Sequence, residues 1–415
     1  MKDSPSSRAS EERERLLFRG AFGDLELERR PRRKREERRA WDSADQLLLS
    51  RLQDELARAP ELLAAPLVVG DRFGALTLSL LSAHPHVSIV VMSGSAVSWQ
   101  AIRENAARNG LLKALEARVE LTSPGSIKNC SLKSRPPSLV LLRLPKSGQR
   151  LAFITAHLAR YSAPMLFLVG VMRAELGRPH IERLRATLGE PVPSRTVRRA
   201  QTLCISGERP APSAPPLPSS YRLPELDLEL CVQPGVFSAE RLDLGARFLL
   251  EQLDQIIAPL QHRSSPRVID LGCGSGVLGL AVARALGRGF FQFIDEDALA
   301  VQSAEESWQR CRFPEEAQAT FSWADGSTQE PEAECADLIL LNPPFHQGRA
   351  VDEALAIGLF RRAGSSLTAG GALWVVCNRH LPHQRALQRL FQRCDRIAEN
   401  PKFVLLRATE VKRHS

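Results

Sequence analysis

The stretch VIDLGCGSGVLGLAVARAL at residues 268–286 constrains the fold more than any other part of the chain. An apolar run leads into Asp270, glycines then occupy every second position, and a helical pattern begins near Val277. These glycines are Gly272, Gly274 and Gly276. Glycine is needed in such a loop because the backbone turns tightly and lets a ligand lie against it, which a Cβ would block. The order of strand, acid, loop and helix therefore predicts the ligand-binding turn of a parallel α/β sheet.

The spacing of this loop indicates the kind of ligand. It is D-x-G-x-G-x-G, whereas the dinucleotide fingerprint is G-x-G-x-x-G. A pyrophosphate favours a helix N-terminus without a nearby anion, while an acid at the loop suits a ligand with a cationic end. S-adenosylmethionine carries an amino group and a sulfonium, and the pattern is that of class I methyltransferases.

Two further acids follow the next strands of the second half. Asp295 ends the second strand and is expected to accept both ribose hydroxyls of the donor through its two oxygens. The alternative for Asp295 is a helix N-cap. Asp325 follows the third strand and is placed either to face the adenine amine or to form a plain turn before Gly326.

The segment Asn342-Pro343-Pro344-Phe345 comes directly after a buried strand. Loops at the carboxyl ends of parallel strands form the ligand crevice. The Asn342 side-chain oxygen and the Pro343 carbonyl can each accept an N–H from an amine whose lone pair is delocalised. Two prolines stiffen the loop, and Phe345 offers a flat face to a planar group. The motif predicts methylation of an amine conjugated to a base or an amide; the alternative is a strand-ending turn.

The rest of the chain alternates strand and helix patterns on either side of a proline-rich stretch. We expect a basic polar arm at 1–40, an α/β domain at 41–206, a linker at 207–220 and a second α/β domain at 221–415. Predicted strands are 67–69, 87–92, 139–144, 165–169, 267–271, 290–294, 338–341, 372–377 and 403–408, with a β-ribbon at 222–237 and a helix over 242–257.

The two halves resemble copies of one domain. The run from Gly70 to Gly74 follows a strand just as the second glycine loop does. Val68 replaces the acid and Arg72 replaces the middle glycine, so we expect a decayed loop that binds no donor. Chance similarity between two α/β domains is the alternative. The strand at 139–144 corresponds to the strand that precedes the catalytic loop in the second copy. Arg143 and Lys146 lie where that loop would be. They are candidates for binding RNA; the alternative is that they are solvated surface charges.

The net charge of +9 over 415 residues suits a polyanionic partner. Eight basic residues and two acids between Arg29 and Arg39 indicate either an arm that contacts phosphates or a solvated segment. The eight cysteines include no pair with zinc-knuckle spacing, and no apolar run is long enough to span a membrane. We expect a reduced, cytoplasmic protein without metal.

With both motifs in view, the chain resembles the RsmC/RlmG family of ribosomal RNA guanine-N2 methyltransferases, and its loop sequences are closer to the large-subunit branch. The segments that carry the resemblance are 40–49, 71–80, 235–250, 268–280, 342–348, 377–381 and 400–406. It implies two tandem Rossmann-like class I methyltransferase domains, the first of them degenerate.

The resemblance also implies S-adenosylmethionine as donor and the exocyclic N2 amine of a guanine in large-subunit (23S) ribosomal RNA, naked or partly assembled, as target. It assigns catalysis to Asn342, Pro343, Pro344 and Phe345, and donor contacts to Asp270, Gly272, Gly274, Gly276 and Asp295. Phe237 is expected either to close over the donor or to be a buried packing residue. We expect a monomer that binds no membrane.

Other functions stay open at this point. The same motif serves methylation of small-subunit RNA, of DNA adenine and of a protein glutamine amide. A non-catalytic RNA-binding assembly factor is the alternative of another class.

Overall fold

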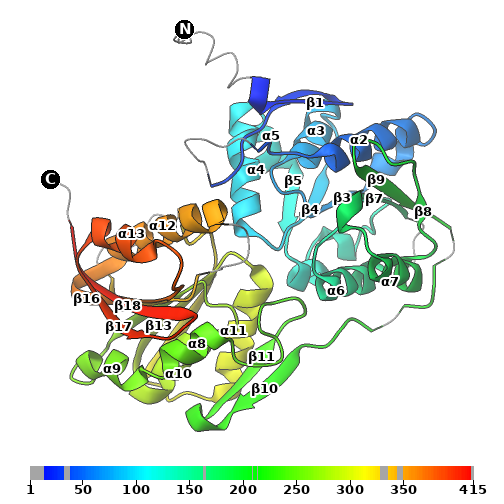
Figure 1. The fold of residues 1–415 in the computed structure, drawn as a ribbon. Coiled ribbons are helices and arrows are strands. Elements are labelled where there is room, and N and C mark those ends of the chain that lie inside the picture. Colours follow the sequence, from blue (N-terminus) through cyan, green and yellow to red (C-terminus); the bar gives the residue numbers. More distant parts are fainter. Residues whose placement is uncertain are drawn as a thin grey trace, which may run out of the picture. The chain divides into compact units, whose positions relative to one another are not determined.

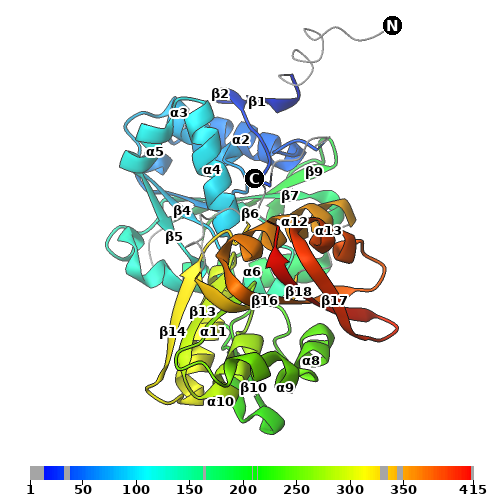
Figure 2. The same ribbon diagram turned by 90° about the vertical axis from the view of Figure 1, so that its left-hand side faces the viewer.

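The computed structural model describes residues 14–31, 38–161, 165–207, 209–212, 214–327, 335–343 and 349–412, without the side chains of 127–129 and 349–354. The chain forms two compact units, Met1–Pro216 and Leu217–Ser415, and each contains one seven-stranded sheet (Figures 1 and 2). The division falls inside the proline-rich stretch.

The sheet of the first unit has the order β5-β4-β3-β6-β7-β9-β8. Its first five members are parallel, whereas β9 runs antiparallel to both β7 and β8. The strands are β3 (Pro66–Val69), β4 (Ile89–Met92), β5 (Val119–Thr122), β6 (Leu139–Arg143), β7 (Leu166–Met172), β8 (Val192–Pro193) and β9 (Ala200–Ile205). The helices are α2 (Ser43–Leu56), α3 (Ala75–Ala83), α4 (Ala96–Arg108), α5 (Leu112–Arg118), α6 (Gly148–Leu158) and α7 (Arg178–Leu188).

The second unit repeats this order as β14-β13-β12-β15-β16-β18-β17, with the last two strands again antiparallel. The strands are β12 (Arg267–Leu271), β13 (Gly289–Asp295), β14 (Ala317–Trp323), β15 (Ala336–Leu341), β16 (Leu367–Asn378), β17 (Phe391–Glu399) and β18 (Phe403–Val411). A ribbon of β10 (Ser219–Leu223) and β11 (Leu228–Val232) precedes them, as predicted. The shared order supports a duplicated domain over a chance resemblance between two α/β folds.

Helices cover both faces of the second sheet (Figure 1). Helices α8 (Leu244–Leu250), α9 (Leu253–Ile257) and α10 (Val277–Leu286) contribute to one apolar core, and α12 (Arg349–Ser366) and α13 (His383–Leu390) contribute to the other. Helix α11 (Ala298–Cys311) packs with the first group. Strands that are buried on both faces are continuous apolar runs in the sequence. The positions of β12 and β15 could therefore be predicted well.

Strand order reverses between β12 and β15, which are neighbours in the sheet. In open parallel sheets, this reversal opens the crevice in which ligands bind, at the carboxyl ends of the strands. The glycine loop follows β12, and Asn342 follows β15. The fold therefore brings the two sequence motifs to one edge of one sheet.

The prediction of a polar arm at 1–40 was wrong for its central part. Residues Leu17–Gly20 and Gly23–Glu26 pair as the antiparallel hairpin β1–β2. The side chains of Phe18, Leu25 and Leu27 are buried in the core of the first unit. Alternating charges on the outer face of the hairpin concealed this apolar face in the sequence.

The first arginines of the basic run also contact the folded unit. Arg30 pairs with Glu104, and the guanidinium of Arg29 lies 4.8 Å from the centre of the Phe73 ring. Residues 32–37 of that run lie outside the described residues. At Arg29 and Arg30, therefore, the segment packs on the folded unit and is not a detached arm.

The helix predicted over 242–257 is two helices, α8 and α9, separated by a turn at 251–252. Besides the β1–β2 hairpin, the sequence predicted no ranges for β5, β8, β9, β14 and β17. Strand β17 is largely exposed at the sheet edge, so its sequence lacks the apolar run that marks a central strand. No helix in the described part of the chain is long and apolar enough to cross a membrane.

Candidate active site

The glycine loop leaves open space in front of its backbone. Gly272 and Gly274 have φ values of +71° and +55°, and a Cβ added at either would meet no atom within 4 Å. Gly276, at φ +85°, is the N-cap of α10, where a Cβ would lie 3.0 Å from the side chain of Ala304. The first two glycines form a cradle that side chains would fill, and the third permits close packing of α11.

Asp270 lies beneath this loop and is buried. Its Oδ2 accepts a hydrogen bond of 2.8 Å from the backbone N–H of Gly279, in the first turn of α10. Burial raises the pKa of Asp270 to about 7, and the nearby carboxylate of Asp295 adds to the increase. One oxygen of Asp270 therefore anchors the helix, a local role that the sequence analysis did not foresee.

Asp295 stands at the end of β13 with both oxygens bonded to the protein. Oδ2 accepts from the N–H of Gly274 at 2.9 Å and Oδ1 accepts from the N–H of Asp297 at 2.8 Å. Burial raises the pKa of the carboxyl to about 6, although these backbone bonds oppose the increase. Each oxygen keeps a second lone pair, so the cradle holds a fixed acid with acceptor capacity. The helix N-cap of α11 is Asp297, not Asp295.

Asp325 is buried and forms a turn. Its Oδ1 accepts from the backbone N–H of Ser327 at 2.9 Å and from the Ser327 hydroxyl at 2.6 Å. For this oxygen, the structure agrees with the alternative that Asp325 forms a plain turn before Gly326. Phe237, by contrast, is 60% exposed, so the packing alternative for its ring is wrong.

Asn342 is the first residue after β15, and it is partly buried. Its Nδ2 donates to Oδ2 of Asp243 at 3.0 Å. Its Oδ1 is shielded from solvent and has no hydrogen-bond partner among the described residues. Pro343 is buried, whereas Pro344 and Phe345 lie outside the residues that the structure describes. The strand end thus presents an unsatisfied carbonyl oxygen, which is an acceptor for a ligand N–H.

Asp243, the N-cap of α8, was not among the predicted site residues. Its carboxylate accepts from the N–H groups of Gly245 and Ala246. An acid directly before an apolar helical run is a recognisable cap signal. Its contact with Asn342, 99 residues along the chain, has no local signature.

In the equivalent loop of the first unit, a side chain of the loop itself accepts hydrogen bonds from the backbone N–H groups. Asp71 accepts from the backbone N–H groups of Gly74, Leu76 and Thr77 at 2.9, 3.2 and 2.8 Å. Asp71 is itself buried. The backbone N–H groups at the start of α3 are therefore bonded to a side chain of the first unit, whereas the second unit has open space in front of its glycine loop.

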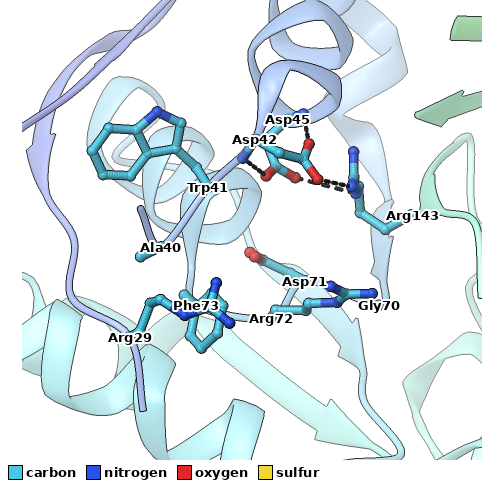
Figure 3. A pocket seen from close by; sticks show the side chains of 10 residues that line it. All are labelled: Arg29, Ala40, Trp41, Asp42, Asp45, Gly70, Asp71, Arg72, Phe73 and Arg143. Carbon is cyan, nitrogen blue, oxygen red and sulfur yellow. Dashed lines mark hydrogen bonds and ion pairs between the residues drawn. The ribbon is translucent and has the colours of Figure 1, made fainter. Parts of the chain in front are cut away.

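The strand end of the first unit is closed by an ion pair. Arg143 ends β6, donates to Asp42 at 2.7 Å and lies 3.2 Å from Asp45, and Figure 3 shows both carboxylates turned toward its guanidinium. Burial raises the pKa of Asp45 to about 6, although Arg143 lowers it. Arg143 is only 10% exposed, so its prediction as an RNA-gripping cation was wrong. Lys146 is 74% exposed.

Sheet register relates the two strand ends. Val69 of β3 pairs with Leu142, and Leu271 of β12 pairs with Leu341. The next residues are Arg143 and Asn342, so these two occupy equivalent positions. No group of three or more His, Cys, Asp or Glu side chains suited to a metal occurs in the described ranges.

Comparisons with known proteins match both units. Residues 16–209 match the RLMG N-terminal domain, and residues 227–407 match the methyltransferase small domain. The ribosomal RNA large subunit methyltransferase G of Pseudomonas aeruginosa PAO1 is 37% identical over 397 residues, which cover 94% of this chain and 99% of that protein. The Shewanella amazonensis protein of the same name is 35% identical over 392 residues, covering 93% and 96%.

A solved structure has the same fold over nearly the whole chain. It is the T. thermophilus 16S rRNA N2 G1207 methyltransferase (RsmC) in complex with AdoMet and guanosine. The TM-score is 0.70 at 22% identity, and the match covers 95% of this chain and 97% of that one. The predicted class of two tandem Rossmann-like methyltransferase domains is confirmed. Because the relatives align along both units at more than a third identity, the chain belongs to the ribosomal RNA large subunit methyltransferase G family.

Proposed function

We propose that this chain transfers a methyl group from S-adenosylmethionine to the exocyclic N2 amine of a guanine in large-subunit (23S) ribosomal RNA. The observation that carries the proposal is the Oδ1 of Asn342, which has no hydrogen-bond partner among the described residues and follows the strand next to the one that carries the open glycine loop. A buried acceptor without a partner costs free energy unless a ligand donates to it.

The residues at the cradle fit the donor. Open space in front of Gly272 and Gly274 admits a ligand against the backbone, and Asp295 at the edge can accept ribose hydroxyls. Asp270 and Asp295 make the surroundings anionic when ionised, which suits an amino group and a sulfonium. When bound, S-adenosylmethionine supplies an electrophilic methyl group. Phe237 has an exposed ring, and it is the residue that we expect to close over the donor.

Asn342 and Pro343 would hold the amine. The two N–H groups of a guanine N2 amine can donate to the Asn342 Oδ1 and to the Pro343 carbonyl. Both bonds would hold the nitrogen with its lone pair aimed at the donor's methyl group and would favour the positive charge that develops on nitrogen. The new N–C bond would replace the S–C bond of the sulfonium, which would leave as a thioether, and the nitrogen would pass a proton to water. Phe345 would stack on the base, which must leave its own stack to reach the loop.

Ribosomal RNA as the substrate rests on the relatives, whose names specify the large subunit. Guanine N2 is named for the T. thermophilus enzyme with the same fold, whose own target is 16S RNA. The net charge of +9 is consistent with a phosphate-rich partner. We place the activity in the cytoplasm, on naked or partly assembled subunits, with the protein acting as a monomer.

The test offers tritiated S-adenosylmethionine with large-subunit RNA, small-subunit RNA, DNA or a release factor, followed by nucleoside or amino-acid analysis. We expect N2-methylguanosine from large-subunit RNA alone. Asn342→Ala should reduce single-turnover methylation roughly 100-fold or more, with donor affinity kept. Gln255→Ala, which removes an exposed side-chain amide that donates to Gln252, is the control.

Labelling of small-subunit RNA, DNA or the release factor would assign the methyltransferase activity to that substrate instead. Labelling of none, with RNA still bound, would indicate a binding or assembly factor. If Asn342→Ala methylates at the parental rate, Asn342 has no catalytic role and the loop is a strand-ending turn.

A further inference from the structure

We propose that Asp243 is a positioning residue for Asn342, which fixes the side-chain amide so that its oxygen faces the amine to be methylated. The inference rests on the proposed function, in which that oxygen accepts an N–H of the substrate. It adds a residue outside the Asn-Pro-Pro-Phe segment and outside the glycine loop.

The carboxylate of Asp243 is held rigidly at the start of α8. Its Oδ2 accepts from the N–H groups of Gly245 at 2.8 Å and Ala246 at 3.0 Å, and from Nδ2 of Asn342 at 3.0 Å. The two backbone bonds hold this oxygen in place independently of its contact with Asn342. The carboxylate is therefore a fixed reference point for the strand end.

This contact selects one orientation of the amide. An ionised carboxylate only accepts hydrogen bonds, so Asn342 must turn its NH₂ group toward Asp243. The opposite orientation would place two oxygens against each other. The Oδ1 atom is consequently directed away from the carboxylate, and it is the atom left without a partner among the described residues.

Gly245 makes room for this arrangement. A Cβ at Gly245 would lie 2.9 Å from Oδ2 of Asp243 and 3.1 Å from Oδ1 of Asn342. Both distances are closer than ordinary contacts, so an alanine there would push on the two atoms that the proposal requires.

The first unit contains the same contact between a helix cap and a strand end, but its hydrogen-bond donor is a different residue. There Asp42 is the N-cap of α2 and accepts from Arg143, which is the positional equivalent of Asn342. A bond between helix cap and strand end is thus common to both copies. Guanidinium only donates, however, whereas an amide donates at one atom and accepts at the other. Only the second unit can therefore use the bond to orient an acceptor.

The test separates capping from positioning with three variants of the full chain. Asp243→Ser keeps a helix cap but is too short to hold Asn342, Asp243→Asn keeps both acceptor roles, and Asp243→Ala loses both. Each is measured by thermal unfolding, by calorimetry with S-adenosylmethionine and by single-turnover methylation at saturating RNA. Asp42→Ser, the equivalent change in the first unit, is the control.

We expect Asp243→Ser to unfold near the parental temperature and to bind the donor normally, but to methylate roughly 10- to 100-fold more slowly, the range for a misplaced reacting group. Asp243→Asn should restore most of that rate, and Asp243→Ala should lose both rate and stability. Asp42→Ser should keep the parental rate.

Two results would overturn the inference. One is a parental rate in Asp243→Ser, and the other is a loss that appears in donor affinity while the single-turnover rate is kept, because this would place Asp243 on the donor. Asn342→Ala, measured in parallel, distinguishes the hypotheses. If Asn342→Ala is slow while Asp243→Ser is not, only the positioning role fails; if Asn342→Ala is also parental, the proposed function fails.

Discussion

The Nη2 atom of Arg143 lies 2.7 Å from Oδ2 of Asp42, and this ion pair closes the strand end of the first sheet. Arg143 also lies 3.2 Å from Asp45, which is mostly buried. Removing the guanidinium would leave two neighbouring carboxylates without their ion-pair partner, which destabilises a low-dielectric site.

The first prediction follows from this pair. Arg143→Met should lower the free energy of unfolding of the first unit by about 2–3 kcal/mol, less than for a fully buried pair because Asp42 is 35% exposed. Lys146→Met is the matched control, since its ammonium is exposed and lies 3.9 Å from Glu175. The control should change stability by less than about 0.5 kcal/mol. Denaturant titration of both variants measures this, and equal stabilities would contradict the structural role of Arg143.

The second prediction concerns Asp295. Asp295→Ala should weaken binding of S-adenosylmethionine by about 1.5–3 kcal/mol, the range for hydrogen bonds to a charged group. Asp297→Ala serves as control because it removes a carboxylate two residues away that caps α11. The control should lose stability and keep donor affinity. Calorimetry compares the two, and an unchanged affinity in Asp295→Ala would remove the ribose assignment.

The third prediction is one donor per chain. Asp71 accepts from three backbone N–H groups, one in the loop of the first unit and two in the first turn of α3, so we expect no second site. Gly274→Arg introduces the residue found at the equivalent position of the first unit. It would strain a backbone at φ +55° by about 1–2 kcal/mol, but its Cβ would meet no atom within 4 Å, so we expect the fold to be kept. It should reduce donor affinity at least roughly 10-fold, because the side chain would fill the cradle. Titration to a stoichiometry of two in the parent would be incompatible with a decayed first loop.

The fourth prediction is a pH dependence of stability. Burial raises the pKa of Asp270 to about 7 in the folded protein, above its ordinary value of 3.8. Between these values the folded state binds the proton more tightly than the unfolded state does, so this contribution to stability is present at low pH and is lost as the pH rises through about 7. Asp270→Asn keeps an acceptor for Gly279 and removes the titration.

Thermal unfolding of the parent and of Asp270→Asn between about pH 5 and about pH 8 checks this. The variant should become more stable relative to the parent as the pH increases, with both proteins free of donor. A difference that stays constant over the whole range would show that Asp270 titrates near its ordinary pKa.

Several elements could be predicted from the sequence because the signal is local. The central strands β12 and β15 are continuous apolar runs, and the glycine loop and the Asn342 segment each follow one of them. The β1–β2 hairpin was missed because Phe18, Leu25 and Leu27 alternate with charged or small residues, and their burial depends on α2 and α3, which follow later in the chain. The break between α8 and α9 likewise has no proline or glycine to announce it.

The sequence by itself determined the fold class, and it located the glycine loop and Asn342 directly after two buried strands. Only the tertiary structure decided which partner each polar group has. Asp243 and Asn342 are 99 residues apart, and Arg143 and Asp42 are 101 apart, so their contacts arise from sheet order and helix placement. Burial, which raises the pKa values of Asp270 and Asp295, is equally a property of the packed domain. Residue types set the available chemistry, whereas packing sets which atoms remain free to act on a ligand.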